Sequence, residues 1–102
     1  MRFLLKATIP VEAGNDLVRD PKFGERLQGI LAQVKPEAAY FLAEHGQRTM
    51  YLVVNFDDPA ELPAYVEPFW LSLEAEVEVL PVMNQEDFAR AATHIQAAAQ
   101  RY

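Results

Sequence analysis

The chain has 102 residues, a formal net charge of −6 and no cysteine. The acidic balance argues against nucleic-acid binding, because phosphate neutralisation needs clustered lysine and arginine side chains. Without cysteine there is no disulfide framework, thiolate zinc site or cysteine nucleophile. No apolar run approaches the roughly 20 residues of a membrane span, and the amino end shows no secretory pattern. We therefore expect one soluble cytoplasmic domain over residues 1–102, with neither nucleic acid nor a membrane as partner.

Residues 2–9 are expected to form a strand, because the segment is short, apolar and followed by Pro10. Its alternate positions separate into two sets. The first set is entirely apolar and consists of Phe3, Leu5, Ala7 and Ile9. We place this set on the covered face of a sheet, and the second set, which includes Leu4 and Lys6, on the other face.

Residues 11–35 are expected to be helical, with a break at Asp20 and Pro21. Asp20 is suited to cap a second helix, and Pro21 to its first position, where no backbone N–H is needed. Beyond the break, apolar side chains recur at helical spacing at Phe23, Leu27, Ile30, Leu31 and Val34. Gly14 and Asn15 are interpreted as a turn or cap before the first helix, since both types tolerate such backbone positions.

Residues 38–44 and 49–56 are expected to be two strands of a hairpin, joined by the polar turn 45–48. One face of the second strand is the more apolar and carries Met50, Leu52, Val54 and Phe56. The other face carries Tyr51, Val53 and Asn55. The hairpin therefore continues the pattern of a sheet with one covered face and one mixed face.

The remainder of the chain predicts a helix, a strand and a final helix. Asp58 is suited to cap a helix over residues 59–73. Residues 74–80 alternate between small apolar and glutamate side chains, which predicts a half-solvated edge strand. Asn84 and Asp87 then predict the start of a helix whose apolar stripe runs from Phe88 to Tyr102. We expect this stripe to pack against its own sheet edge or against another subunit.

The order of elements predicts an α+β protein with the ferredoxin-like βαββαβ arrangement: a four-stranded antiparallel sheet, helices on one face, and an extra C-terminal helix. The helices cover only one face of such a sheet. The other face is expected to carry Leu4, Lys6, Thr8, Tyr40, Leu42, Tyr51, Val53, Asn55, Glu76 and Glu78. These side chains are too apolar for a solvent-exposed face and too polar for a dry core. A second copy of the chain packed against this face would bury the apolar groups and leave a cavity lined by the polar ones. We therefore expect a homodimer through this face.

Four strings of the sequence resemble a known group of proteins. They are residues 9–15 (Ile-Pro-Val-Glu-Ala-Gly-Asn), 35–41 (Lys-Pro-Glu-Ala-Ala-Tyr-Phe), 46–48 (Gly-Gln-Arg) and 67–70 (Glu-Pro-Phe-Trp). With the element order, they resemble the dimeric α/β barrel superfamily, in which two ferredoxin-like sheets pack face to face. Within it they resemble a family of bacterial proteins of about this size to which no reaction is assigned. Some members are labelled pantothenate-synthetase-like, but this chain lacks the length and the phosphate-binding motifs that ATP-dependent ligation requires.

The side chains expected to line the cavity are Lys6, Tyr40, Tyr51, Asn55, Trp70 and Glu78. The first and fourth strands are neighbours in this fold, so Lys6 can meet Glu76 or Glu78. Such a pair is either an acid–base site with perturbed pKa or a cross-strand ion pair of at most about 1 kcal/mol. The tyrosines and Asn55 can hydrogen-bond an oxygen-bearing ligand or pack at a wet interface. We expect Trp70 at the dimer contact or the rim of the pocket.

No cofactor or metal is expected. His45 and His94 are the only histidines, and neither has a second ligand at metal-binding spacing. No glycine-rich phosphate motif is present. Two hypotheses remain. The first is a homodimer that binds a small organic ligand in the cavity; the alternative is a small cofactor-independent enzyme, of the isomerase, lyase or monooxygenase type, that uses the same cavity.

Overall fold

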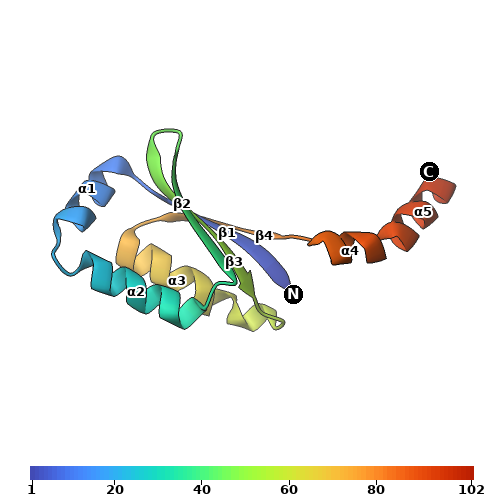
Figure 1. Cartoon of the computed structure of the whole chain (residues 1–102), viewed down its shortest axis with the longest axis horizontal. Coiled ribbons are helices and arrows are strands. Elements are labelled where there is room, and N and C mark those ends of the chain that lie inside the picture. The colour runs from blue at the N-terminus through green and yellow to red at the C-terminus, as the bar shows by residue number, and fades with distance from the viewer.

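A four-stranded sheet forms the centre of the computed structural model, which describes residues 1–102. The strands are β1 (Arg2–Ile9), β2 (Ala38–Glu44), β3 (Gln47–Asn55) and β4 (Glu76–Pro81). They lie in the order β2-β3-β1-β4, and every neighbouring pair is antiparallel. This is the predicted ferredoxin-like arrangement, with β2 and β4 at the two edges (Figure 1).

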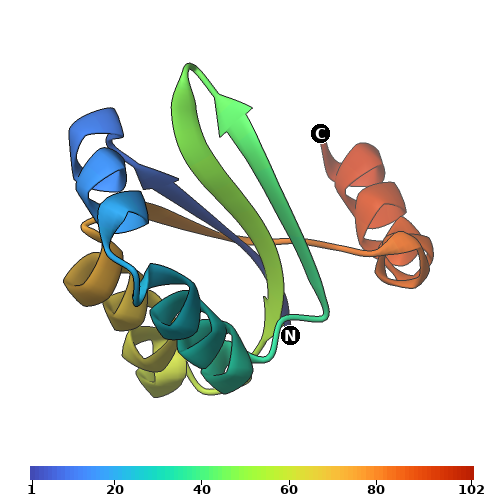
Figure 2. The same cartoon turned by 60° about the vertical axis from the view of Figure 1, so that its left-hand side comes forward.

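The helices lie on the two sides of this sheet. One face is covered by α1 (Val11–Arg19), α2 (Phe23–Val34) and α3 (Leu62–Leu73). Figure 2 shows this layer and the uncovered face of the sheet. Two further helices, α4 (Gln85–Arg90) and α5 (Ala92–Arg101), follow β4 and project from the uncovered side. None of the helices has the length and apolar character needed to cross a membrane.

The core lies between the sheet and its helical layer. The predicted alternation holds in β1 and β3, because Leu5, Leu52 and Val54 are fully buried on the face toward the helices. Phe69 and Leu73 of α3 are buried against the same cluster. Burying an aliphatic or aromatic side chain of this size contributes about 1.5–3 kcal/mol, so this face stabilises the fold and leaves the opposite face free for other use.

The hairpin between β2 and β3 is tighter than the sequence predicts. Its turn consists of His45 and Gly46, with φ of 52° and 75°, instead of four residues. Two positive φ values in succession are typical of the type I′ turn, whose twist matches that of the strands. The tighter turn lets Gln47 pair with Glu44, which extends the ladder to the hairpin tip.

Two predictions for the first helices are wrong. The second helix begins at Phe23 with Lys22 at its cap, two residues later than predicted, and Asp20 Oδ1 accepts the backbone N–H of Lys22 at 2.9 Å. Gly14 lies inside α1 rather than in a turn. A Cβ atom there would lie 2.7 Å from Nη1 of Arg48, so glycine gives room to the Arg48 side chain.

Residues 83–102, here called the C-terminal arm, depart most from expectation. The predicted capping box is confirmed: the Asn84 side chain accepts the N–H of Asp87 at 2.8 Å, and Asp87 accepts that of Asn84 at 3.0 Å. The single predicted helix is divided at Ala91 into α4 and α5. Phe88 is 58% exposed and Ile95 51% exposed, so the stripe does not pack against its own sheet edge.

The C-terminal arm gives the chain an extended shape. The radius of gyration is 16.7 Å and the longest dimension 57 Å, whereas a compact chain of this length has a radius of gyration of about 13 Å. The accessible surface is 7181 Å², against about 5,800 Å² for a compact monomer of this mass. The arm and the uncovered sheet face therefore leave an unusual amount of surface in contact with solvent.

Candidate functional site

The uncovered face of the sheet, here called the open face, brings four of the predicted site residues into one row. Tyr40 of β2 lies opposite Tyr51 of β3, Tyr51 opposite Lys6 of β1, and Lys6 opposite Glu78 of β4. Neighbouring strands lie about 4.8 Å apart, so each side chain of the row is next to the following one. The period of two in the strands puts this row on the face opposite the fully buried Leu5 and Leu52, away from the helices.

The partner of Lys6 is a residue that the sequence analysis missed. The Lys6 ammonium forms an ion pair with Glu44 at the end of β2. Tyr51 donates its hydroxyl hydrogen to the other carboxylate oxygen of Glu44 at 2.5 Å. The Lys6 and Glu44 side chains retain only 23% and 26% of their exposure. Glu44 has the same parity as Tyr40 in β2, so the alternation already placed its side chain on the open face.

The electrostatics of this cluster keep each group in its ordinary charge state. Hydrogen bonds from Lys6 and from Tyr51 lower the pKa of the Glu44 carboxyl below its usual 4.5. The hydrogen bond to Glu44 raises the pKa of Lys6 above 10.5 and that of Tyr51 above 10.0. At neutral pH the cluster is therefore an ammonium, a carboxylate and a neutral phenol, with the ammonium 5.8 Å from the centre of the Tyr51 ring.

A polar hollow of about 170 Å³ adjoins the cluster at the hairpin end of the open face. It is lined by Lys6, Thr8, Glu44, His45, Gln47, Glu76 and Glu78. The last two glutamates are exposed and take part in none of the ion pairs of the structure. Lys6 was expected to lie beside them, and the strand pairing confirms that Glu78 is its neighbour, but Lys6 forms its ion pair with Glu44.

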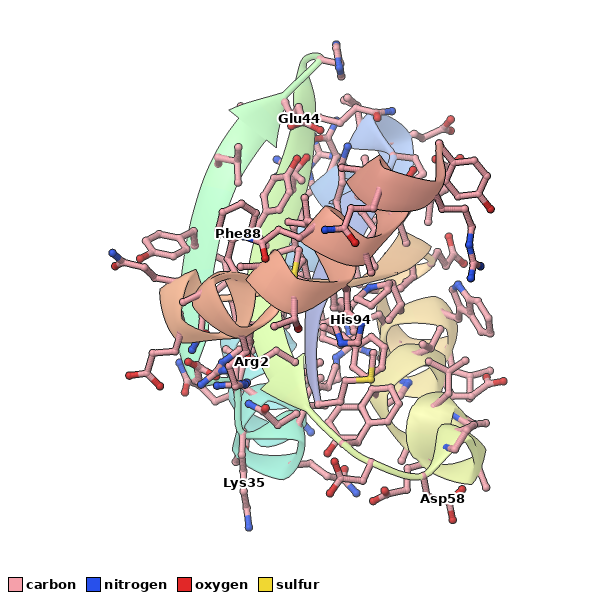
Figure 3. The ribbon with its side chains drawn as sticks, turned by 90° about the vertical axis from the view of Figure 1, so that its right-hand side faces the viewer. Arg2, Lys35, Glu44, Asp58, Phe88 and His94 are labelled. Carbon is pink, nitrogen blue, oxygen red and sulfur yellow. The ribbon has the colours of Figure 1, made fainter.

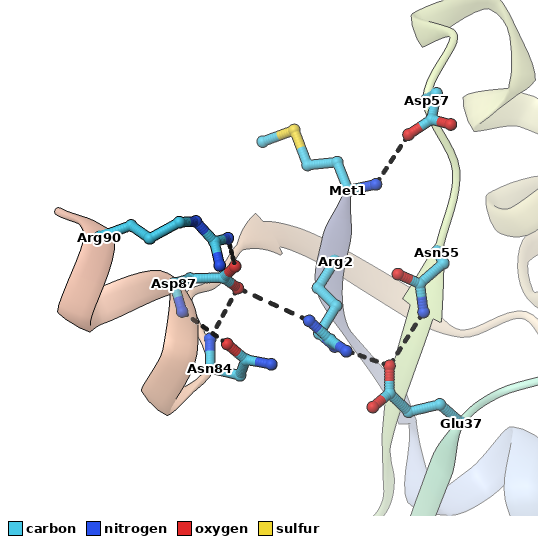
Figure 4. A network of polar contacts seen from close by, with 8 residues as sticks. All are labelled: Met1, Arg2, Glu37, Asn55, Asp57, Asn84, Asp87 and Arg90. Atoms are coloured by element: carbon cyan, nitrogen blue, oxygen red, sulfur yellow. Dashed lines mark hydrogen bonds and ion pairs between the residues drawn. The ribbon is translucent and has the colours of Figure 1, made fainter.

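Asn55 belongs to a different cluster. It lies at the far end of β3, where its side chain donates to Glu37 at 2.9 Å, and Arg2 donates to the same carboxylate oxygen at 2.8 Å (Figure 4). Arg2 also approaches Asp87 of the C-terminal arm at 3.6 Å. Hydrogen bonds from Asn55 and then from Arg2 lower the pKa of Glu37. The structure does not bring Asn55 together with Lys6, because Asn55 lies four positions beyond Tyr51 along an extended strand.

Trp70 also lies away from the row. It is on α3, in the helical layer on the other side of the sheet, and its side chain is exposed. The tertiary structure therefore removes it from the open face, although the sequence analysis correctly placed it outside the core. The consecutive bulky residues Phe69, Trp70 and Leu71 predict that one of these side chains lies outside the core, but they do not predict on which surface of the protein it lies.

Histidines and acids do not assemble into a metal site. No group of three or more histidine, cysteine, aspartate or glutamate side chains has the arrangement to hold an ion. His45 stands at the hairpin tip beside the polar hollow, whereas His94 is on the exposed α5. The chemistry available on the open face is therefore that of the ammonium, the phenols and the carboxylates.

A family model covers residues 1–96 of the chain, from β1 through α4 and into α5. The chain belongs to the family described as Domain of unknown function (DUF3303). The DUF3303 match includes every strand of the sheet, the Lys6–Glu44–Tyr51 cluster and the C-terminal arm as far as Gln96. No curated protein matches the chain.

Proposed function

We propose that this DUF3303 protein is a homodimer joined through the open face, and that it binds a small organic ligand in the cavity between the two sheets. The observation that carries the proposal is the row of Tyr40, Tyr51, Lys6 and Glu78 across the open face, with Lys6 held by Glu44. A half-buried, ion-paired lysine and a hydrogen-bonded phenol beside apolar side chains are typical of a ligand site, in which few polar groups fix the orientation of the ligand.

The apolar part of the open face supports the dimer. Leu4 pairs with Val53 on one side and with Leu80 on the other, which makes an apolar row beside the row of Lys6. Tyr40 and Leu80 are among the exposed large hydrophobic side chains. Contiguous apolar surface of this kind on a small chain is typical of a protein contact. A second open face supplies the matching surface, because both copies carry the same two rows.

The size of the hollow also supports a site shared between two copies. Its 170 Å³ in one chain falls below the range of about 300–1,000 Å³ that is common for ligand sites. Two open faces that stack on each other enclose a larger space and remove it from bulk water. The site is then completed by the second copy.

The lining groups indicate the chemical class of the ligand. Glu76 and Glu78 carry carboxylates without an ion-pair partner, so they can accept hydrogen bonds from hydroxyl or amino groups of a ligand. Leu4 and Val53 offer an apolar wall next to the row of Lys6. We therefore expect a small molecule with an apolar or aromatic body and one or more hydroxyl or amino groups.

The alternative function is a cofactor-independent enzyme of the isomerase, lyase or monooxygenase type in the same cavity. The hydrogen-bonded set of Lys6, Glu44 and Tyr51 favours it, because it contains an acid and a base in contact. The pKa directions favour ligand binding instead. An acid–base catalyst works best with a pKa near the operating pH. Here the pKa of Glu44 is lowered and the pKa values of Lys6 and Tyr51 are raised, so all three move away from neutrality.

The dimer is tested by light scattering on the full chain at micromolar concentration. We expect the mass of a dimer, and we expect Val53→Glu to give a monomer, because its charge would be buried without a partner in the dimer contact. The matched control is Gln28→Glu, which adds the same charge on the exposed side of α2. A monomeric wild type, or a dimer that tolerates Val53→Glu as well as Gln28→Glu, would contradict this interface.

Ligand binding is tested by ligand-observed NMR with a library of small hydroxylated and aminated aromatic molecules. We expect hits for the wild type that are lost in Lys6→Met and weakened in Tyr51→Phe, while both variants stay folded by circular dichroism. Lys22→Met is the control, since it removes an exposed ammonium outside the open face. Hits that survive Lys6→Met would place the ligand elsewhere, and turnover of a hit by the wild type would favour the enzyme.

A further inference from the structure

The C-terminal arm has no partner within its own chain. Every residue of α5 is exposed, and α4 contains no buried residue. Apart from the base of the arm, where Arg2 meets Asp87 at 3.6 Å, no ion pair joins the arm to the rest of the molecule (Figure 4). An amphipathic helix pair whose apolar stripe faces water gains stability only by covering that stripe with another surface.

The base of the arm fixes its direction away from the sheet. Val82 still donates its N–H to the carbonyl of Arg2 at 3.2 Å, so the sheet ladder continues to that residue. Two residues later, the capping box of Asn84 and Asp87 starts α4. No residue of α4 is buried, so α4 leaves the end of β4 without packing against the sheet. The arm therefore stands off from the open face, in front of it in Figure 3 and beside it along the long axis in Figure 1.

We propose that the C-terminal arm of each chain docks on the second copy of the dimer, in an apolar groove beside β2. This proposal rests on the dimer inferred above and assigns to the arm the role of a clasp. The groove has a volume of about 210 Å³ and is lined mainly by apolar side chains, among them Phe23 and Leu27 of α2, and Phe41 and Met50 of the hairpin. Phe41 is 56% exposed there, so the groove is also without a partner.

The symmetry of a stacked dimer brings arm and groove together. A two-fold axis that lies between the sheets and runs along the strands reverses the strand order, so β4 of one copy lies over β2 of the other. It also places Lys6 over Tyr51 of the second copy, and Glu78 over Tyr40 of the second copy. An axis across the strands at this row would instead stack Lys6 on Lys6 and Glu78 on Glu78. Repulsion between like charges disfavours that choice.

The arm has the length to reach the groove. Stacked sheets lie about 10 Å apart, and α4 and α5 are about 9 Å and about 15 Å long at 1.5 Å per residue. An arm that leaves β4 therefore passes the β2 edge of the second copy and reaches its helical layer, where Phe23 and Leu27 lie. The arm would also cover the free edge of β2, which is the exposed end of the sheet ladder.

Surface area and charge support the C-terminal arm as the segment that occupies the groove beside β2 of the second copy. The chain exposes 7181 Å², about 1,400 Å² more than a compact monomer, and stable protein contacts bury about 1,200–2,000 Å² in total. Residues 88–102 carry two arginines and no acid, whereas residues 1–84 carry thirteen acids and seven bases. The C-terminal arm as a whole is neutral, because Glu86 and Asp87 balance Arg90 and Arg101, but its distal part over residues 88–102 is basic and complements the acidic body. The polar side of α5 is rich in glutamine rather than lysine, which disfavours a membrane surface as the partner.

The contact is tested first by cross-linking the full chain, which has no cysteine of its own. The double variant Phe88→Cys with Phe41→Cys is oxidised and run on a non-reducing gel, and the linked peptides are mapped. We expect a covalent dimer with a disulfide between positions 88 and 41. The matched control places the arm cysteine at Gln96 in place of Phe88, on the polar side of the arm, and we expect it to give little covalent dimer. Equal yields of covalent dimer from the two cysteine pairs would overturn the proposed docking of the arm in the groove.

The second test measures the dissociation constant of the dimer for Ile95→Asp and, in the groove, Phe41→Asp. We expect each to weaken the dimer by at least about tenfold, as removal of a buried apolar anchor does, while Gln96→Asp leaves it unchanged. If all three variants dimerise like the wild type, the clasp is overturned and the stacked dimer stands. If the wild type itself is monomeric, the proposed dimer has failed, and the clasp with it.

Discussion

Lys6 and Glu44 form an ion pair although their strands are not neighbours. Lys6 is on β1 and Glu44 is on β2, and β3 lies between them. The long side chains meet over Tyr51 of β3, whose hydroxyl donates to the same carboxylate. One carboxylate thus joins three strands of the open face, and it keeps the Lys6 ammonium in a fixed place beside the hollow.

Glu44→Gln should change the dependence of stability on acid. The folded pKa of Glu44 lies below its ordinary value of 4.5, so its contribution is present above the unfolded pKa and is lost as pH falls through the folded pKa. We expect the variant to lose less stability than the wild type between neutral pH and the region below 4.5. Urea unfolding at a series of pH values measures this. Glu25→Gln, on the exposed side of α2, is the control, and identical slopes for all three proteins would contradict the role of Glu44.

Gly29→Ala should stabilise the chain. Gly29 lies in the interior of α2, and a Cβ atom there has nothing within 4 Å. Alanine restricts the unfolded chain and favours the helix, so the free energy of unfolding should rise by about 0.5–1 kcal/mol. Gly46→Ala has the same open surroundings but a φ of +75°, and we expect it to cost about 1–2 kcal/mol. Thermal or urea melts that rank the two variants the other way would refute this assignment.

Leu52→Ala should destabilise the fold strongly. Leu52 is fully buried at the centre of β3, between the sheet and the helical layer. Truncation leaves a cavity and loses the transfer energy of the side chain, at a cost of about 2–5 kcal/mol. Leu71→Ala is the matched control, since Leu71 is 79% exposed, and surface changes of this kind stay within about 0.5 kcal/mol. A loss below about 1 kcal/mol at Leu52 would mean that the core is not where the structure has it.

Phe88→Ala should have different effects on the monomer and on the dimer. In the isolated chain Phe88 is 58% exposed, so in the monomeric Val53→Glu background its loss should cost less than about 1 kcal/mol. The apolar stripe of the sequence predicts that Phe88 makes an apolar contact, and we expect that contact only between two copies. In the dimeric chain the same substitution should raise the dissociation constant, as measured by sedimentation at a series of dilutions. A large loss of stability in the monomer would show that the arm packs on its own body.

The candidate site could be predicted in part. Alternation within each strand, together with the expected strand order, placed Lys6, Tyr40, Tyr51 and Glu78 on one face, and the register confirms their row. Glu44 has the parity of Tyr40, so alternation placed it on the same face, but its ion pair with Lys6 reaches across β3 and depends on how two long side chains meet in three dimensions. Asn55 shares the parity of Tyr51, but parity carries no information on distance along a strand.

The sequence was sufficient to predict the order of strands and helices, the apolar face of each strand, and the capping residues Asp58, which caps a short 3-10 turn before α3, and Asn84, which caps α4. These follow from local periodicity and from side chains that bond their own backbone, both of which act over a few residues. The tertiary structure alone decided that Glu44 is the partner of Lys6, that Trp70 is in the helical layer, and that the C-terminal arm leaves the body. Each of these depends on where the chain lies in three dimensions relative to distant segments. The apolar stripe of the C-terminal arm predicts a contact with another surface, and the exposure of Phe88 and Ile95 in the structure shows that its own sheet does not provide that contact.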